Sequence, residues 1–138
     1  MSQYHVERLD RTNLPPADAE RLARLLVHVW PDRKDLETRR REHATPVPPG
    51  PDPRQQPCVF VVRDGTEEIV AEAKAFPRTV RTPQGDRTVL ALAGVACHAD
   101  YRGRGLGRMV VRAAFELVDE GAYELALFQT SNVVRPFY

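Results

Sequence analysis

The hydrophobic and polar positions of the chain first follow a strand-like period and then a helical one. Residues 4–10 alternate loosely between apolar and polar side chains, which predicts a short first strand. Residues 13–30 place leucines and valines three and four positions apart after two prolines, which predicts a helix capped by Asn13. Residues 32–44 predict a second, more polar helix after the break at Pro31.

The middle of the chain predicts three consecutive antiparallel strands. Residues 58–64 and 68–82 are apolar runs on either side of a short glycine-containing turn, which is typical of a hairpin. A second turn over 83–86 leads to residues 87–98, a nearly continuous apolar run of the kind expected for a central strand.

The last third of the chain predicts a helix and a further strand. Residues 105–120 carry an apolar stripe at helical spacing, Gly121 is a natural stop, and 123–130 read as a strand. We therefore expect a mixed, mostly antiparallel sheet flanked by helices, which is α/β in content and α+β by strand order. Six prolines and a glycine make residues 45–57 a loop, and we expect it to join two segments of one core in a single domain, 1–138.

Composition and charge narrow the classes of function. The chain is 42% hydrophobic and 28% charged, which is ordinary for a globular protein. No apolar run approaches the roughly 18 residues of a membrane span, and the first ten residues lack the pattern of an export signal. We expect a cytoplasmic protein without a membrane partner, and a net charge of +1 argues against a nucleic-acid binder.

Neither of the two cysteines predicts a bridge or a metal site. Cys58 and Cys97 are 39 positions apart in apolar, strand-like surroundings. We expect reduced core thiols and no bound metal.

A basic run stands in the second predicted helix. Arginines occupy positions 39–41, between Glu37 and Glu42. This mixture of charges favours a solvated helix face over an anion site.

A stretch rich in glycine and arginine, residues 101–108, leads directly into the third predicted helix. The start of a helix leaves unpaired backbone N–H groups and a partial positive charge, which together attract anions. Glycines let the backbone curl and let an anion approach closely. The arginines Arg102, Arg104 and Arg108 add positive charge, so the stretch predicts a phosphate or pyrophosphate site.

Three phosphate-binding motifs compete for this stretch. A Walker loop requires a Gly-Lys-Ser/Thr ending, and the stretch contains no lysine. The dinucleotide fingerprint Gly-x-Gly-x-x-Gly fails at Arg108, and antiparallel hairpins precede it instead of a βαβ unit. The third motif, Arg/Gln-x-x-Gly-x-Gly/Ala, is matched fully by residues 102–107. A tight exposed turn without a ligand stays open as an alternative for these six residues taken alone.

The motif and the segment before it, residues 93–101, resemble the GNAT family of acyl-CoA N-acyltransferases. The order of predicted elements resembles that family over the whole chain, and residues 131–138 are similar to its helix ending in a Phe-Tyr pair. Among relatives, the aminoglycoside 2'-N-acetyltransferases look particularly similar. The resemblance implies an N-acetyltransferase that uses acetyl-CoA as co-substrate and acetylates an amine of a small molecule or a protein.

The resemblance also assigns residues to the binding of acetyl-CoA. It implies that the turn binds the pyrophosphate and that the preceding strand offers backbone hydrogen bonds to the pantetheine arm and the thioester carbonyl. Ser131 stands near the place of a CoA-contacting asparagine, from which Asn132 is one position away. The implied cofactor-binding residues are Val95, Ala96, Cys97, Arg102, Gly103, Arg104, Gly105, Leu106, Gly107, Arg108 and Ser131.

The resemblance also implies candidates for the catalytic acid and base. Tyr138 occupies the place of the acid that protonates the departing thiolate. Glu72 and His98 are the better candidates for the base, and a chain of water molecules is the alternative. His28 and Trp30 fall where the acceptor site is commonly shaped, although core packing is favoured for Trp30.

One departure from the family concerns the end of the sequence. Members usually continue past the Phe-Tyr pair with two more strands, whereas this chain stops at Tyr138. We therefore expect a C-terminally short domain with a bare apolar edge strand, which invites association. A truncated chain, a chain completed by a partner such as a second copy in a homodimer, and a degenerate member of the family stay open as explanations. Two other interpretations stay open: an acyl-CoA-binding module without turnover, and a nucleotide-binding protein of another fold.

Overall fold

The computed structural model describes residues 4–124 and 126–128, and these form a mixed five-stranded sheet with the strand order β1-β2-β3-β4-β5. The first four strands are antiparallel neighbours, and β5 runs parallel to β4. This arrangement confirms the predicted fold class. The strands are β1 (Val6–Asp10), β2 (Cys58–Arg63), β3 (Ile69–Thr82), β4 (Gly85–Cys97) and β5 (Ala126–Phe128).

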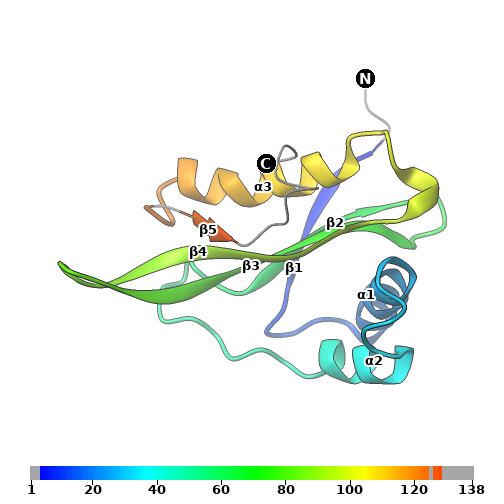
Figure 1. Cartoon of the computed structure of the whole chain (residues 1–138), viewed down its shortest axis with the longest axis horizontal. Coiled ribbons are helices and arrows are strands. Elements are labelled where there is room, and N and C mark those ends of the chain that lie inside the picture. The colour runs from blue at the N-terminus through cyan, green and yellow to red at the C-terminus, as the bar shows by residue number, and fades with distance from the viewer. Residues whose placement is uncertain (1–3, 125, 129–138) are drawn as a thin grey trace.

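Helices cover both faces of the sheet (Figure 1). Helices α1 (Pro16–Val29) and α2 (Leu36–Ala44) lie on one face, and α3 (Leu106–Asp119) lies on the other. Each face has its own buried core, one packed under α3 and the other under α1. We call these the α3-side core and the α1-side core. Within the described part of the chain, every helix is too short or too polar to traverse a bilayer.

Two helix starts differ from the prediction. The predicted cap Asn13 is wrong: α1 begins at Pro16 with Pro15 in the capping position and no side-chain cap. Proline suits this place because it has no N–H to satisfy and its φ is already helical. Helix α2 begins at Leu36 rather than at residue 32, because the Asp35 carboxylate accepts a hydrogen bond from the Thr38 N–H and caps the first turn.

The turns and cysteines agree with the sequence prediction. The β3–β4 hairpin turns tightly between Thr82 and Gly85, and its two strands extend beyond the rest of the sheet as an arm (Figure 1). Gly121, at φ +86°, follows the end of α3 in the left-handed conformation that commonly terminates helices. Cys58 and Cys97 are both free thiols, the first buried and the second half-buried.

A β-bulge at Gly94 interrupts the regular alternation of β4. The register between β3 and β4 shifts there, and Gly94 has φ +64°. Leu92 before the bulge and Cys97 after it both pack on the α3-side core, although an odd number of positions separates them. Ala96 packs instead on the α1-side core. The extra residue therefore resets which side chains of β4 face each helix layer.

Candidate functional site

The glycine-rich turn joins β4 to α3 through a short 3₁₀ helix, η1 (Ala99–Tyr101). Gly103 has φ +85° and Gly105 has φ +77°, a left-handed conformation that favours glycine. A Cβ at either position would meet nothing within 4 Å, so the turn opens onto free space. Leu106 is fully buried and anchors the helix start in the α3-side core.

The backbone at the start of α3 offers unpaired donors. Gly105 occupies the capping position without a side-chain cap, and the first helical hydrogen bond runs from the Met109 N–H to the Gly105 carbonyl at 3.0 Å. The preceding amides, of residues 106–108, therefore have no helical acceptor. The first turn carries no acidic residue that would compete for them. This arrangement can hold an anion.

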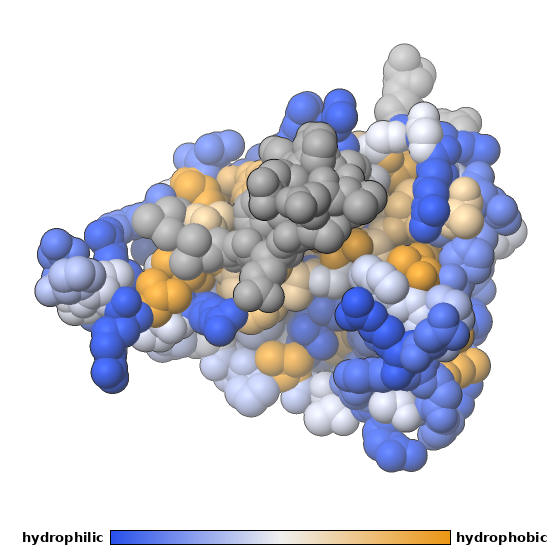
Figure 2. Space-filling view, in the orientation of Figure 1, coloured by the Kyte–Doolittle hydropathy of each residue, from blue (hydrophilic) through white to orange (hydrophobic). Residues whose placement is uncertain are grey.

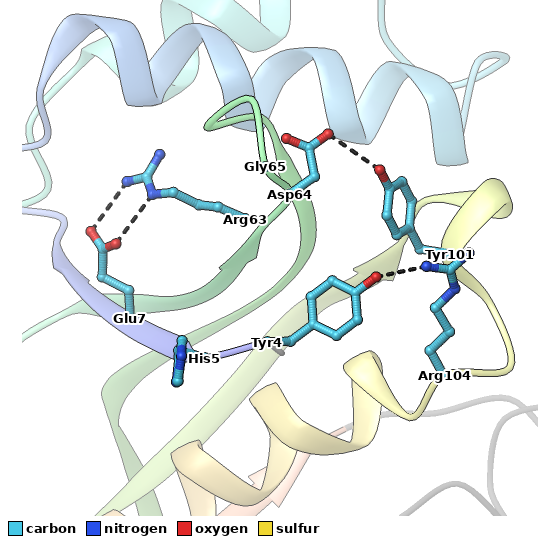
Figure 3. Close-up of a pocket in the computed structure, with 8 residues that line it drawn as sticks. All are labelled: Tyr4, His5, Glu7, Arg63, Asp64, Gly65, Tyr101 and Arg104. Atoms are coloured by element: carbon cyan, nitrogen blue, oxygen red, sulfur yellow. Dashed lines mark hydrogen bonds and ion pairs between the residues drawn. The ribbon is translucent and has the colours of Figure 1, made fainter. Parts of the chain in front are cut away.

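All three arginines of the turn, Arg102, Arg104 and Arg108, are exposed. Arg104 also donates from Nη1 to the Tyr4 hydroxyl at 2.6 Å, and its guanidinium lies 5.0 Å from the centre of the Tyr101 ring (Figure 3). This contact ties the turn to Tyr4, two positions before the start of β1.

A cavity of about 530 Å³ lies beside the turn. Its wall carries both signs of charge, and much of that charge is already paired. Arg63 contacts the Glu7 carboxylate at 3.1 and 3.2 Å, and the Tyr101 hydroxyl donates to Asp64 at 3.3 Å (Figure 3). The lining residues are Tyr4, His5, Glu7, Arg63, Asp64, Gly65, Tyr101 and Arg104.

The backbone of β4 after the bulge directs donors away from β3. The His98 N–H donates to the Val70 carbonyl at 2.8 Å. Because hydrogen-bonded and non-hydrogen-bonded positions alternate in an antiparallel pair, the N–H groups of Val95 and Cys97 point to the opposite side. On that side β5 pairs with β4 only as far as Leu92 within the described residues. Val95 and Cys97, which the family resemblance assigns to the thioester, therefore have N–H groups that point away from β3.

Glu72 lies directly behind this segment of β4. Its side chain is completely buried on the α1 side of the sheet, opposite Ala96, and Lys74 Nζ lies 2.8 Å from its Oε1. A Cβ at Gly94 would approach Glu72 Oε1 to 3.1 Å, so the bulge places the backbone of β4 against this carboxylate. Burial raises the pKa of Glu72, and the nearby Lys74 charge opposes that rise.

The other candidate base, His98, is engaged in local structure. Its ring stacks on His28 with centres 3.7 Å apart. The His98 Nδ1 accepts a hydrogen bond from the Asp100 N–H, and the His28 Nε2 accepts one from the Ala99 N–H, both at 3.1 Å. The two rings thus hold η1 in place. Trp30 packs against the α1-side core, in line with the packing interpretation.

The predicted solvated face of α2 is wrong for one arginine. Arg40 pairs with glutamates and Arg41 is exposed, which fits the hydrophilic side chains gathered over α2 at the lower right of Figure 2. Arg39, however, is only 7% exposed, and so is buried with His43 one helical turn further on. Charge patterning missed this because α2 turns polar side chains, rather than an apolar stripe, toward the sheet.

Two of the predicted site residues, Ser131 and Tyr138, lie outside the described residues. Their roles stay predictions.

The fold is thus a mixed sheet covered by helices on both faces, in which the bulged strand β4 leads through a glycine turn into α3. Residues 12–138 match a family model described as an acetyltransferase (GNAT) domain. The chain belongs to this family and is an acetyltransferase. A search of curated proteins finds no match.

Solved structures are similar over nearly the whole chain. A putative acetyltransferase from Agrobacterium tumefaciens is 23% identical, with a TM-score of 0.71 over 97% of this chain and 88% of that one. An acetyltransferase from Trypanosoma brucei is 20% identical, with a TM-score of 0.68 over 99% and 89%. An aminoglycoside acetyltransferase from an uncultured soil sample, in complex with sisomicin, is 16% identical, with a TM-score of 0.65 over 96% and 81%.

Proposed function

We propose that residues 1–138 form one domain that transfers an acetyl group from acetyl-CoA to a primary amine of a small molecule or a protein. The observation that carries the proposal is the uncapped start of α3, where two left-handed glycines leave the amides of residues 106–108 open to an anion. A pyrophosphate fits this position because it is anionic and needs several N–H donors at once.

The β4 segment supports the acyl-transfer step. An outward-facing amide of Val95 or Cys97 would donate to the thioester oxygen and stabilise the negative charge that develops there. As the amine nitrogen forms its bond to the carbonyl carbon, the carbon–sulfur bond breaks and the sulfur takes up a proton. Glu72 would receive the proton that leaves the amine, through water or directly, because it lies just behind this segment.

The amine acceptor is supported by the family and by one solved neighbour. The neighbour that binds sisomicin is described as an aminoglycoside acetyltransferase, so this fold accommodates an amine-rich acceptor there. For this chain we propose a primary amine as the reacting group. The fold alone does not fix the rest of the acceptor molecule.

Ligand binding tests the turn. We expect CoA to raise the melting temperature, whereas pantetheine, which lacks the pyrophosphate, has little effect. Gly105→Ala should weaken CoA binding, because the variant strains the turn. Gly85→Ala is the matched control, since Gly85 also has a positive φ (+111°) but lies at the turn between β3 and β4.

Catalysis is tested by release of free thiol from acetyl-CoA with a panel of amines. Thiol release that depends on the amine supports the proposal. CoA binding without amine-dependent thiol release would instead favour a binding module. Stabilisation by ATP or NAD but not by CoA would contradict the assignment of the turn.

A further inference from the structure

Five polar side chains meet in the protein interior between β3 and α2, and we call them the buried polar cluster. Arg11 follows β1 directly, Arg39 and His43 come from α2, and Glu72 and Lys74 come from β3. Arg39, His43, Glu72 and Lys74 are each at most 9% exposed, and Arg11 is half-buried at the margin. These groups act electrostatically on one another.

The cluster carries an excess of positive charge. Glu72 and Lys74 form a pair of zero net charge, whichever of the two holds the shared proton. Burial, with Lys74 and Arg11 nearby, lowers the pKa of His43 to about 4, so its ring is neutral at pH 7. Among the described residues, no carboxylate lies within ion-pair distance of Arg11 or Arg39. Neither guanidinium therefore has a direct ion pair, and the carboxylates of Glu72 and, for Arg39, of Glu42 act on them only at longer range. A buried charge without a direct partner is costly.

Three buried atoms of the cluster also lack hydrogen-bond partners within the described structure: Arg39 Nε, His43 Nε2 and Glu72 Oε2. His43 Nδ1 lies 2.7 Å from the Arg39 carbonyl and so holds the ring proton, which makes Nε2 an acceptor. The three atoms without hydrogen-bond partners are thus one cationic donor and two acceptors. Each buried group without a partner destabilises the fold, so the cluster is complementary to a ligand that supplies an anion and N–H or O–H donors.

We propose that the buried polar cluster binds the acceptor of the reaction, and that this acceptor is a small zwitterion in which a primary amine accompanies a carboxylate or a phosphate. The anionic group would bind Arg39 and Arg11. The amine end would meet Glu72 Oε2. The part of this inference that concerns the amine rests on the proposed acetyl transfer. The part that concerns the anion does not.

The position of the cluster agrees with this orientation. Glu72 and Lys74 touch the bulge of β4, because a Cβ at Gly94 would lie 3.1 and 3.2 Å from their side-chain atoms. An amine at Glu72 would therefore be next to the strand that we assign to the thioester. Arg11 forms the margin of the cluster: its backbone is held by hydrogen bonds with Pro57 and Val47, and its half-buried side chain is the most exposed of the five.

Binding without turnover is the first test. Melting temperatures are measured with β-alanine, phosphoethanolamine, ethylamine or propionate. We expect a rise with β-alanine if the anion is a carboxylate, or with phosphoethanolamine if it is a phosphate, and little change with ethylamine. No rise with either zwitterion, or an equal rise with ethylamine, would overturn the proposal.

Two variants and one control variant make the binding test specific. Arg39→Met should abolish the rise, and it should still fold because it removes a buried charge that has no direct ion pair and keeps the aliphatic stem. Arg11→Met, at the half-buried margin, should reduce the rise as a second variant. Arg41→Met, on the exposed face of the same helix, should leave it unchanged. A rise retained in both Arg39→Met and Arg11→Met would exclude the cluster as the site.

Steady-state kinetics separate this inference from the proposed function. For the zwitterion that binds, Arg39→Met should raise KM by about 10- to 100-fold, the loss expected for a charged hydrogen bond, and this rise should exceed any change in the KM for ethylamine. Thiol release that is equally efficient with ethylamine would leave acetyl transfer intact and exclude the zwitterionic acceptor. Binding that depends on Arg39 without any thiol release would retain the site and exclude the transfer.

Discussion

The Nζ of Lys74 lies 2.8 Å from the Oε1 of Glu72, and both side chains are buried against the bulge of β4. Only two positions separate the pair along β3, so both side chains point to the same face of the sheet. The carboxylate that we assign as the base is therefore held by a neighbour on its own strand.

Loss of this carboxylate should affect transfer more than binding. We expect Glu72→Gln to lower kcat by about 10²- to 10⁴-fold, the usual contribution of a general base. The dissociation constant of CoA, measured by calorimetry, should stay within a few-fold of the wild-type value because the turn is distant in sequence and unaltered. An unchanged kcat would assign the base elsewhere.

The pH dependence of kcat should reflect the burial of Glu72. A raised pKa means that the Glu72 carboxylate loses its charge already above the ordinary value of 4.5, so kcat should fall as the pH decreases through the raised pKa. Lys74→Met removes the cation that opposes the rise. The acidic limb of the pH–rate profile should then move to higher pH, and a move to lower pH would contradict this arrangement.

The bulge glycine should tolerate no side chain. Gly94→Ala combines a positive φ of +64° with a Cβ only 3.1 Å from Glu72 Oε1 and 3.2 Å from Lys74 Nζ. We expect it to reduce the free energy of unfolding by about 1–3 kcal/mol, measured by urea denaturation. Gly121→Ala has a similar φ of +86° but open space, and it should cost less. Equal losses would mean that backbone strain alone accounts for the effect.

His43 should contribute to the loss of stability in acid. Its pKa is lowered from 6.5 to about 4 in the folded protein, so the unfolded chain binds the extra proton between these values. Stability from this group is complete above pH 6.5 and falls as the pH decreases toward 4. By pH 5 the free energy of unfolding of the wild type should have fallen by about 2 kcal/mol, and His43→Leu should lack this decrease.

Urea denaturation at pH 7 and pH 5 measures this difference directly. His5→Gln, at an exposed ring, is the control for the loss of any histidine. A pH dependence that is the same in His43→Leu and the wild type would show that the buried ring is already charged.

Local signals in the sequence predicted the hairpins, the turn and the helix after it. The turn at residues 102–107 could be predicted because its signals, the spacing of the glycines and the amphipathic stripe that follows, lie close together in the sequence. Family membership and fold class followed from that motif and from the order of elements.

Features that depend on tertiary packing could not be read in this way. The bulge at Gly94 lies in a nearly continuous apolar run, where alternation gives no signal for an extra residue. Arg39 is buried near the charged side chains of Glu72 and Lys74 on β3, and α2 has no apolar stripe to indicate which side faces inward. Both features lie at the candidate site, where local preference and function commonly differ.

The bulge also limits how the length of the chain can vary. Removal of one residue near Gly94 would restore regular alternation and turn Val95 and Cys97 toward α1, with Ala96 toward α3. The outward amides of the same segment would then point back at β3. One residue added at the tip of the β3–β4 arm would leave these directions intact, so tolerance of insertions and deletions should differ sharply between the two ends of β4.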